Sequence, residues 1–135
     1  MPSIQLPVDR NAAARARRFV VETLRGWGIG DAVILDCELL ASELVTNAVL
    51  HARSSSKLRI EQRGERIWVA VHDASPSAPR LRDYGPEAVT GRGLLLVERI
   101  AARWGTEKDA NGKFVWFELH TGGQAVSRRE ATVSP

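Results

Sequence analysis

The sequence predicts a single α+β domain in which helices pack on one face of a mainly antiparallel sheet. The chain has 135 residues, which is enough for one sizeable core and too few for two. Hydrophobic residues make up 44% of it, a globular composition. Segments with strand and helix periods follow in the order strand, helix, helix, two strands, long loop, helix, two strands. We therefore expect one domain over residues 1–120 and a polar, disordered tail over 121–135.

The first part of the chain predicts an edge strand and two helices. Residues 3–8 alternate as a short strand, and Pro7 confines it to an edge of the sheet because proline cannot donate to a strand ladder. A helical pattern runs over 11–28. A second, more apolar helix is expected over 31–52, with Asp31 as its N-cap.

The second part predicts two hairpins separated by a long loop and a helix. The first hairpin alternates apolar and polar residues and turns at Gly64-Glu65, and the second is predicted from its Asn111-Gly112 turn. The predicted elements are strands 57–64 and 66–73, a helix over 93–105, and strands 106–110 and 113–120. Between them, residues 74–92 hold three prolines and two glycines without periodicity. Loops longer than about 12–15 residues are usually functional or disordered.

Composition narrows the class of protein. Nineteen basic residues against sixteen acidic ones give a net charge of only +3, so nothing in the charge requires a nucleic-acid partner. The lone Cys37 cannot form an intramolecular disulfide, which favours a reducing compartment. No apolar run approaches the roughly 18 residues of a membrane span, and the N-terminus lacks a signal-peptide layout. A cytoplasmic protein that binds neither membrane nor nucleic acid is the expectation.

A polar strip interrupts the apolar second helix. Glu43, Asn47 and His51 are four residues apart, so they fall within about 80° of arc on a helical wheel. No lysine or arginine occurs between Arg25 and Arg53, although a solvated helix face usually mixes both signs of charge. Carboxylate and amide oxygens without basic partners suit a hard cation such as Mg²⁺. The alternative is an exposed strip that happens to lack lysine.

Two further features add to this strip. Asp73 comes directly after an apolar strand, where its carboxylate could accept a hydrogen bond from an exocyclic amine of a ligand; alternatively it is a turn aspartate. Gly91 and Gly93 immediately precede a predicted helix, with Arg92 between them. First-turn N–H groups favour anions, and glycine allows close approach of a phosphate. A plain loop-to-helix junction is the alternative for this last feature.

The segments SELVTNAVLHA, VAVHDASPSAP, GRGLLLV and NGKFVWFEL, in this order, resemble the nucleotide-binding boxes of the GHKL ATPases. This superfamily has the Bergerat ATP-binding fold, and the resemblance covers roughly residues 3–120. Within it, the chain is most similar to the small anti-sigma factor serine kinases and the related ATP-binding regulatory proteins of actinomycetes. The resemblance implies ATP and Mg²⁺ as cofactors.

The resemblance also implies roles for single residues. Asn47 would hold Mg²⁺ against the triphosphate, and Glu43 would be the catalytic base. Asp73 would contact the adenine amine, and His51 would lie on the nucleotide-facing helix. The phosphates would be gripped by the second glycine box, which comprises Gly91, Arg92, Gly93 and Leu94.

One box departs from the family pattern. Kinase members read DxGxG, whereas this chain reads DASPS over 73–77, with Ser75 and Ser77 in place of the glycines and Pro76 between them. Proline fixes its own φ angle and removes a donor, so this loop cannot flex as a glycine loop does. Nucleotide binding is therefore better supported than phosphoryl transfer.

Three functions follow from these observations. The first is an ATP-binding anti-sigma factor-type regulator that acts as a serine/threonine kinase. Its implied partners are a sigma factor and a STAS-type anti-anti-sigma protein, the serine substrate, and a homodimer is also implied. The second is a nucleotide-dependent partner switch without kinase activity. The third is nucleic-acid binding through the arginines of the first predicted helix and the basic residues of 53–66, which contain no recognition motif and no pattern of interleaved aromatic residues.

Overall fold

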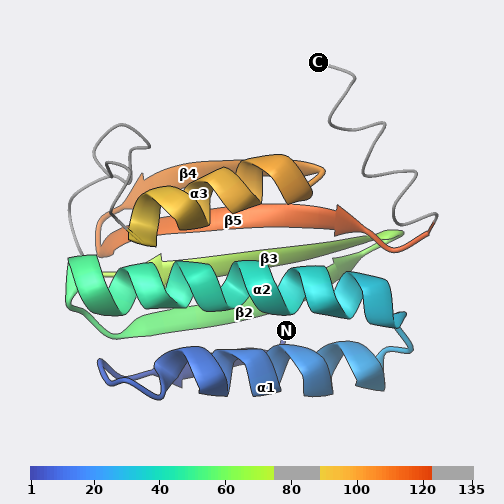
Figure 1. Cartoon of the computed structure of the whole chain (residues 1–135), viewed down its shortest axis with the longest axis horizontal. Helices are drawn as coiled ribbons and strands as arrows, with labels where there is room; N and C mark the ends of the chain where they lie inside the picture. The colour runs from blue at the N-terminus through green and yellow to red at the C-terminus, as the bar shows by residue number, and fades with distance from the viewer. Residues whose placement is uncertain (75–88, 123–135) are drawn as a thin grey trace.

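A computed structural model describes residues 1–74 and 89–122, except for the side chains of 51–52 and 89–94. Its elements are β1 (Ser3–Leu6), α1 (Ala12–Gly26), α2 (Asp31–Asn47), the π-helical turn η1 (Ala48–Ala52), β2 (Ser56–Arg63), β3 (Arg66–Asp73), α3 (Val89–Ile100), β4 (Arg103–Asp109) and β5 (Gly112–His120). Three helices lie on one side of a five-stranded sheet (Figure 1). The predicted α+β class and the predicted order of elements are confirmed.

The sheet is antiparallel throughout, in the order β1-β2-β3-β5-β4. The two hairpins meet where β3 pairs with β5, so the chain brings segments far apart in sequence to the centre of the sheet. β1 pairs with β2 alone and stops before Pro7, which confirms its position at an edge.

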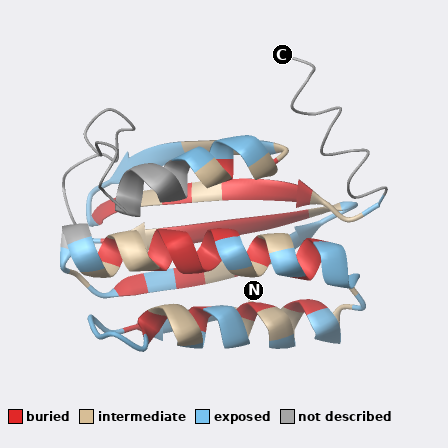
Figure 2. Ribbon diagram, viewed as in Figure 1, coloured by how far each residue is buried: buried red, intermediate tan, exposed pale blue. Residues whose placement is uncertain are grey.

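The core lies between the helices and one face of the sheet. Alternate residues of β2, β3 and β5 point towards the helices, and Figure 2 shows buried residues concentrated along these strands and the inner sides of the helices. Leu58, Ile60 and Phe117 are fully buried in this layer. Cys37 also lies there, and burial raises the pKa of its thiol well above the usual range, so it behaves as a small core residue.

Local hydrogen bonds and backbone conformation explain where α1 ends and where α2 begins. The Ile29 N–H donates to the carbonyl of Leu24 and the Gly28 N–H to that of Arg25, which is a Schellman motif. Gly28 has φ of +76°, a conformation that glycine adopts without strain. The N-cap of α2 is Gly30 and not Asp31, which is already the first helical residue. The predicted cap is therefore wrong by one position.

Several predicted boundaries in the second half are also wrong. α3 begins at Val89 and ends at Ile100, four residues earlier at its start than the predicted 93–105 helix and five earlier at its end. β4 consequently begins at Arg103 instead of residue 106. The second hairpin turns at Ala110-Asn111, because Gly112 already pairs with Asp109. Pairing of β4 with β5 overrides the local helical pattern over 103–105 and sets the position of the turn. The predicted tail lies, from residue 123 on, outside the described residues.

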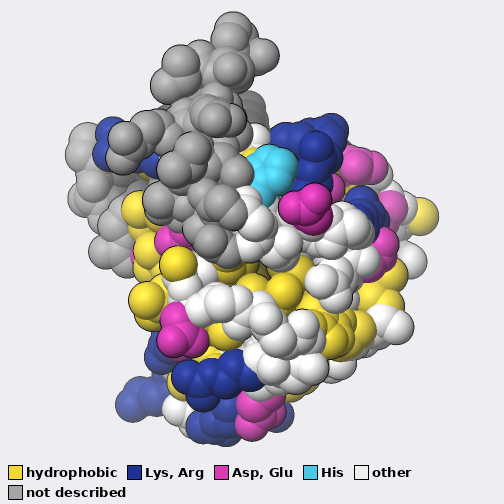
Figure 3. All heavy atoms as spheres, turned by 90° about the vertical axis from the view of Figure 1, so that its right-hand side faces the viewer, with side chains coloured by type: hydrophobic (Ala, Val, Ile, Leu, Met, Phe, Trp, Pro, Cys, Tyr) yellow, Lys and Arg dark blue, Asp and Glu magenta, His cyan; other side chains and the backbone are white. Residues whose placement is uncertain are grey.

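Among the described residues, no helix is both long and apolar enough to cross a membrane. At the end of the molecule where β5 ends, side chains of both charge signs surround a hydrophobic surface (Figure 3). This end therefore presents no surface of a single charge sign.

Candidate functional site

Four chain segments converge at one end of the molecule. The C-terminal part of α2 with η1, the end of β3, the beginning of β5 and the beginning of α3 all lie at the left of Figure 1. They carry most of the residues that the sequence singled out. The fold thus brings together parts of all four boxes, which are distant in the chain.

The polar strip of α2 faces inwards. Glu43 is only 8% exposed, and Leu40 beside it is fully buried. At Glu43 the alternative of an exposed strip is therefore wrong. Asn47 is half-buried, and its Oδ1 is buried yet accepts no hydrogen bond from the described residues. A buried acceptor without a donor is unfavourable by itself, and a bound cation or ligand donor would satisfy it.

The helix changes its winding directly after Asn47. The Thr46 hydroxyl donates to the Ser42 carbonyl at 2.8 Å, a back-bond that tends to bend helices. Residues 48–52 then form a π turn, which ends at Arg53 with φ of +51°. Because a π turn holds more residues per turn than an α-helix, His51 does not follow the wheel angle predicted for it. The His51 side chain itself lies outside the described part of the structure.

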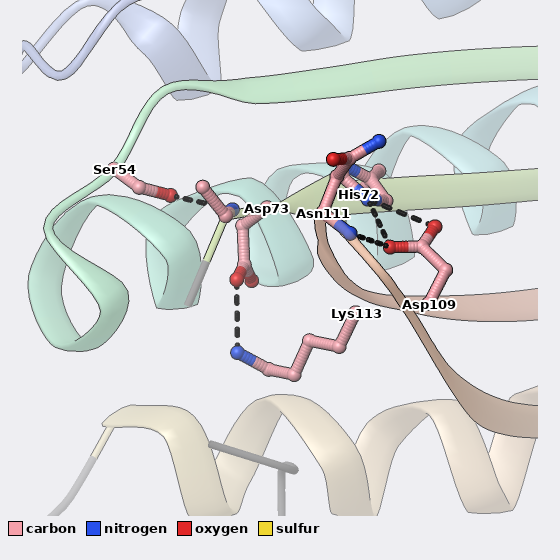
Figure 4. A network of polar contacts seen from close by, with 7 residues as sticks. Ser54, His72, Asp73, Asp109, Asn111 and Lys113 are labelled. Carbon is pink, nitrogen blue, oxygen red and sulfur yellow. Dashed lines mark hydrogen bonds and ion pairs between the residues drawn. The ribbon is translucent and has the colours of Figure 1, made fainter. Parts of the chain in front are cut away.

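Asp73 ends β3 with its side chain on the helix-facing side. Its Oδ1 accepts a hydrogen bond from Lys113 Nζ at 2.9 Å, and the side chains of Asp73 and Lys113 are 10% and 9% exposed (Figure 4). The next residue, Ala74, donates its N–H to Ser54 Oγ at 3.2 Å, which ties the end of β3 to the segment after η1. Asp73 is thus a buried carboxylate, unlike an ordinary turn aspartate.

Sequence reasoning missed Lys113. The strand pattern could have indicated it. Lys113 alternates along β5 with three residues that belong to the core: Val115, Phe117 and Leu119. A lysine in the first of these core-facing positions requires a buried partner. That partner, Asp73, is 40 residues away in sequence and became recognisable only through the pairing of β3 with β5.

Gly112 makes this contact possible. A Cβ on Gly112 would lie 2.0 Å from the Asp73 carbonyl oxygen and 2.8 Å from Ala74 Cα. Asp109 fixes the adjoining turn: it accepts the Asn111 N–H at 2.9 Å and lies 3.2 Å from His72 Nε2 (Figure 4). The hydrogen bond with His72, then that from the Asn111 N–H, holds the pKa of Asp109 below its usual value.

Replacing Gly112 by alanine should destabilise the fold by at least about 2 kcal/mol, because overpacking against backbone atoms cannot relax by a side-chain rotation. Thermal unfolding measures this loss. Gly64→Ala is the matched control: Gly64 has φ of +60° but nothing within 4 Å of its added Cβ. The free energy of unfolding of Gly64→Ala should fall by only about 1 kcal/mol. Equal losses in both variants would contradict the close approach at Gly112.

The second glycine box lies differently from its prediction. Gly91, Arg92 and Gly93 belong to the first turns of α3 instead of preceding it, since the helix begins at Val89. The N–H groups of residues 89–92 are therefore those without intrahelical partners. The side chains of Arg92 and Leu94, together with Ser75, Pro76 and Ser77, lie outside what the structure describes.

The residues present fit a nucleotide with a hard cation. The orphaned Asn47 Oδ1 is an oxygen donor of the type that Mg²⁺ prefers. Within the described residues, no three His, Cys, Asp or Glu side chains gather as a metal site. A cation here would therefore depend on oxygens of a bound phosphate as well as on Asn47, which is how Mg²⁺ commonly binds with nucleotides.

The opposite face of the sheet carries some of the basic residues of the nucleic-acid hypothesis, among them Arg59 and Arg63 of β2. Strand pairing places Arg59 and Arg63 over the Trp68 ring, at 5.4 and 4.3 Å from its centroid. They line a hollow of about 370 Å³ with Arg103, Glu107, Phe114, Trp116 and Glu118. Aromatic and basic side chains thus lie next to one another on this face, although they do not alternate along the sequence. Arg63 is also paired with Glu61 at 2.6 Å, and the acidic residues dilute the positive charge of this face.

Solved structures with a similar fold include the following three. One is the SiaB-SiaC complex from Pseudomonas aeruginosa, with 13% identity, a TM-score of 0.59, and coverage of 87% of this chain and 88% of that chain. Another is the catalytic domain of the histidine kinase ThkA, with 16% identity, a TM-score of 0.52, and coverage of 90% and 98%. The third is the histidine kinase domain of a blue-light activated kinase from Erythrobacter litoralis, with 17% identity, a TM-score of 0.51, and coverage of 95% and 65%. At these identities the likeness shows the fold alone.

No curated protein sequence matches the chain. A protein family, described as the histidine kinase-like ATPase domain, matches residues 6–119 of the chain. These residues include α2, β3, α3 and β5 and hence every segment of the candidate site. The predicted GHKL relationship is therefore confirmed, and the chain belongs to the histidine kinase-like ATPase domain family.

Proposed function

We propose that the chain binds ATP with Mg²⁺ between α2, α3 and the end of β3, and that it regulates a partner protein in an ATP-dependent manner. One observation carries the proposal: the unsatisfied, buried Asn47 Oδ1 and the buried Asp73 carboxylate come from separate boxes to one end of the molecule. Calorimetry of the purified chain with MgATP tests it. Absence of binding to the folded protein would overturn it.

Each residue has a defined role in this proposal. Asp73 accepts a hydrogen bond from the base, and the first-turn N–H groups of α3 donate to phosphate oxygens. Asn47 contributes an oxygen to Mg²⁺, which when bound neutralises phosphate charge. Glu43, one helical turn before Asn47, takes the proton of the attacking hydroxyl at its carboxylate. Positioning and electrostatics account for most of the catalysis in such a reaction.

The protein partner follows from resemblance and from one structural neighbour. Resemblance to the anti-sigma factor serine kinases implies a STAS-type serine substrate and a sigma factor. SiaB, a similar fold, was solved in a complex with another protein, which supports a role in protein recognition. Incubating the chain with labelled ATP and a candidate STAS protein tests transfer, and a labelled serine is the expected product.

A partner switch without catalysis is the second candidate. Ser75, Pro76 and Ser77 occupy the positions of a flexible glycine box, which favours a site that binds nucleotide without closing over it. In that case ATP binds and changes the affinity for the partner, but no phosphate is transferred. Partner affinity measured with and without MgATP, beside the transfer assay, separates the two candidates.

Asp73→Asn should weaken ATP binding by about 1–3 kcal/mol, the range for an unsatisfied buried polar contact. The amide presents a donor where the adenine amine needs an acceptor. Purine riboside triphosphate, which lacks the amine, is the matched control ligand and should lose much less affinity. Calorimetry with both nucleotides measures the difference. Equal losses for both would remove Asp73 from contact with the amine.

A further inference from the structure

Lys113 occupies a core-facing position of β5, where an apolar side chain would be expected. It shares its face of the strand with Val115 and Phe117, both in the core, and its own side chain is 9% exposed. Desolvating a charged pair is unfavourable, and a buried ion pair is often no more stable than apolar residues of similar volume. Apolar packing therefore does not account for a lysine here. Lys113 compensates the buried Asp73 carboxylate, and it also offers a donor beside Asp73 to a ligand.

The fold holds this donor firmly in place. Lys113 and Asp73 are register partners across β5 and β3, and Nζ lies 2.9 Å from Oδ1. Gly112 allows the two strand ends to approach closely. An ammonium carries three N–H donors, of which this bond uses one, while a carboxylate offers about four lone-pair sites. The pair therefore presents a donor and an acceptor side by side at the end of the sheet (Figure 4).

We propose that Lys113 reads the purine together with Asp73, so that the site accepts a 6-oxopurine nucleotide as well as an adenine nucleotide. This inference rests on the proposed nucleotide site. Adenine presents an amine donor next to a ring-nitrogen acceptor, and hypoxanthine presents an N–H donor next to a carbonyl acceptor. A carboxylate alone would face the hypoxanthine carbonyl with a second acceptor and reject it. With the Lys113 ammonium alongside, adenine places its amine on Asp73 and its ring nitrogen on Lys113. Hypoxanthine presents the two groups in the reverse order, so it binds shifted in the plane of the base, with its N–H on Asp73 and its carbonyl on Lys113.

Inosine triphosphate, whose base is hypoxanthine, is the direct probe. Wild-type protein should bind MgITP within about tenfold of MgATP. Lys113→Met should lower ITP affinity much more than ATP affinity, widening the ratio by at least about tenfold, because the carbonyl then faces a carboxylate without a donor. Lys113→Arg retains a cation and should keep the ratio near that of wild type. Lys57→Met, which removes an exposed lysine of β2, controls for the loss of one charge.

The outcomes separate this inference from the proposed function. If wild type binds ATP but binds ITP more than about 100-fold more weakly, Lys113 does not read the base and the nucleotide site stands. An unchanged ATP-to-ITP ratio in Lys113→Met has the same meaning. If the folded wild type binds neither nucleotide, both proposals fail. Should circular dichroism show that Lys113→Met does not fold, the wild-type ratio and Lys113→Arg still decide.

Discussion

Glu43→Ala is expected to lower phosphate transfer to a serine-bearing partner by about 10²–10⁴-fold while most of the ATP affinity remains. A general base acts on the transition state, so its loss affects turnover more than binding. Glu43 lies on the inward strip of α2, one turn before Asn47, which puts it beside the proposed phosphate region instead of the base. The measurement is transfer from labelled ATP, run beside calorimetry on the same preparations.

Two variants control this experiment. Glu43 is 8% exposed, so Glu43→Gln keeps its volume while removing the base, and it should be as inactive as Glu43→Ala. Glu38→Ala removes a carboxylate from another side of the same helix and should leave transfer intact. Transfer that survives both Glu43 substitutions would exclude Glu43 as the base. If wild type binds ATP firmly yet transfers nothing, the partner-switch function is favoured.

Asn47→Ala should weaken MgATP binding by at least about 100-fold, because the site loses a buried oxygen that makes no hydrogen bond to the described residues and suits Mg²⁺. The apo protein should unfold at the same temperature or slightly higher, since the substitution removes an acceptor that makes no hydrogen bond. Calorimetry with Mg²⁺ and with a chelator measures the metal-dependent part of the affinity. Thermal unfolding of the apo variant measures any change in the stability of the fold.

Asn47→Asp is the matched comparison, because it retains an oxygen ligand and should bind MgATP more tightly than Asn47→Ala. A decrease in affinity that is the same with and without Mg²⁺ would show that Asn47 contacts the nucleotide itself. Unchanged affinity in Asn47→Ala would remove the residue from the site altogether.

Much of the fold could be predicted because periodicity is a local property. Alternation in 57–64 and 66–73 predicted a hairpin with one buried face, and Ile67, Val69 and Val71 are indeed buried together. The order of the boxes predicted the family, which residues 6–119 match. Boundaries were less predictable: residues 103–105 carry a helical pattern yet join β4, because pairing with β5 satisfies their backbone groups there.

The sequence by itself determined the order of the elements, the single core and the candidate residues Glu43, Asn47 and Asp73. Only the tertiary structure decided that Glu43 is buried, that the helix turns π-helical after Asn47, and that Lys113 contacts Asp73. The physical reason is that hydrophobic period follows from neighbours along the chain, whereas burial and ion pairing depend on which strands and helices meet. Lys113 and Asp73 are 40 residues apart, and the register of β3 against β5 alone makes them partners.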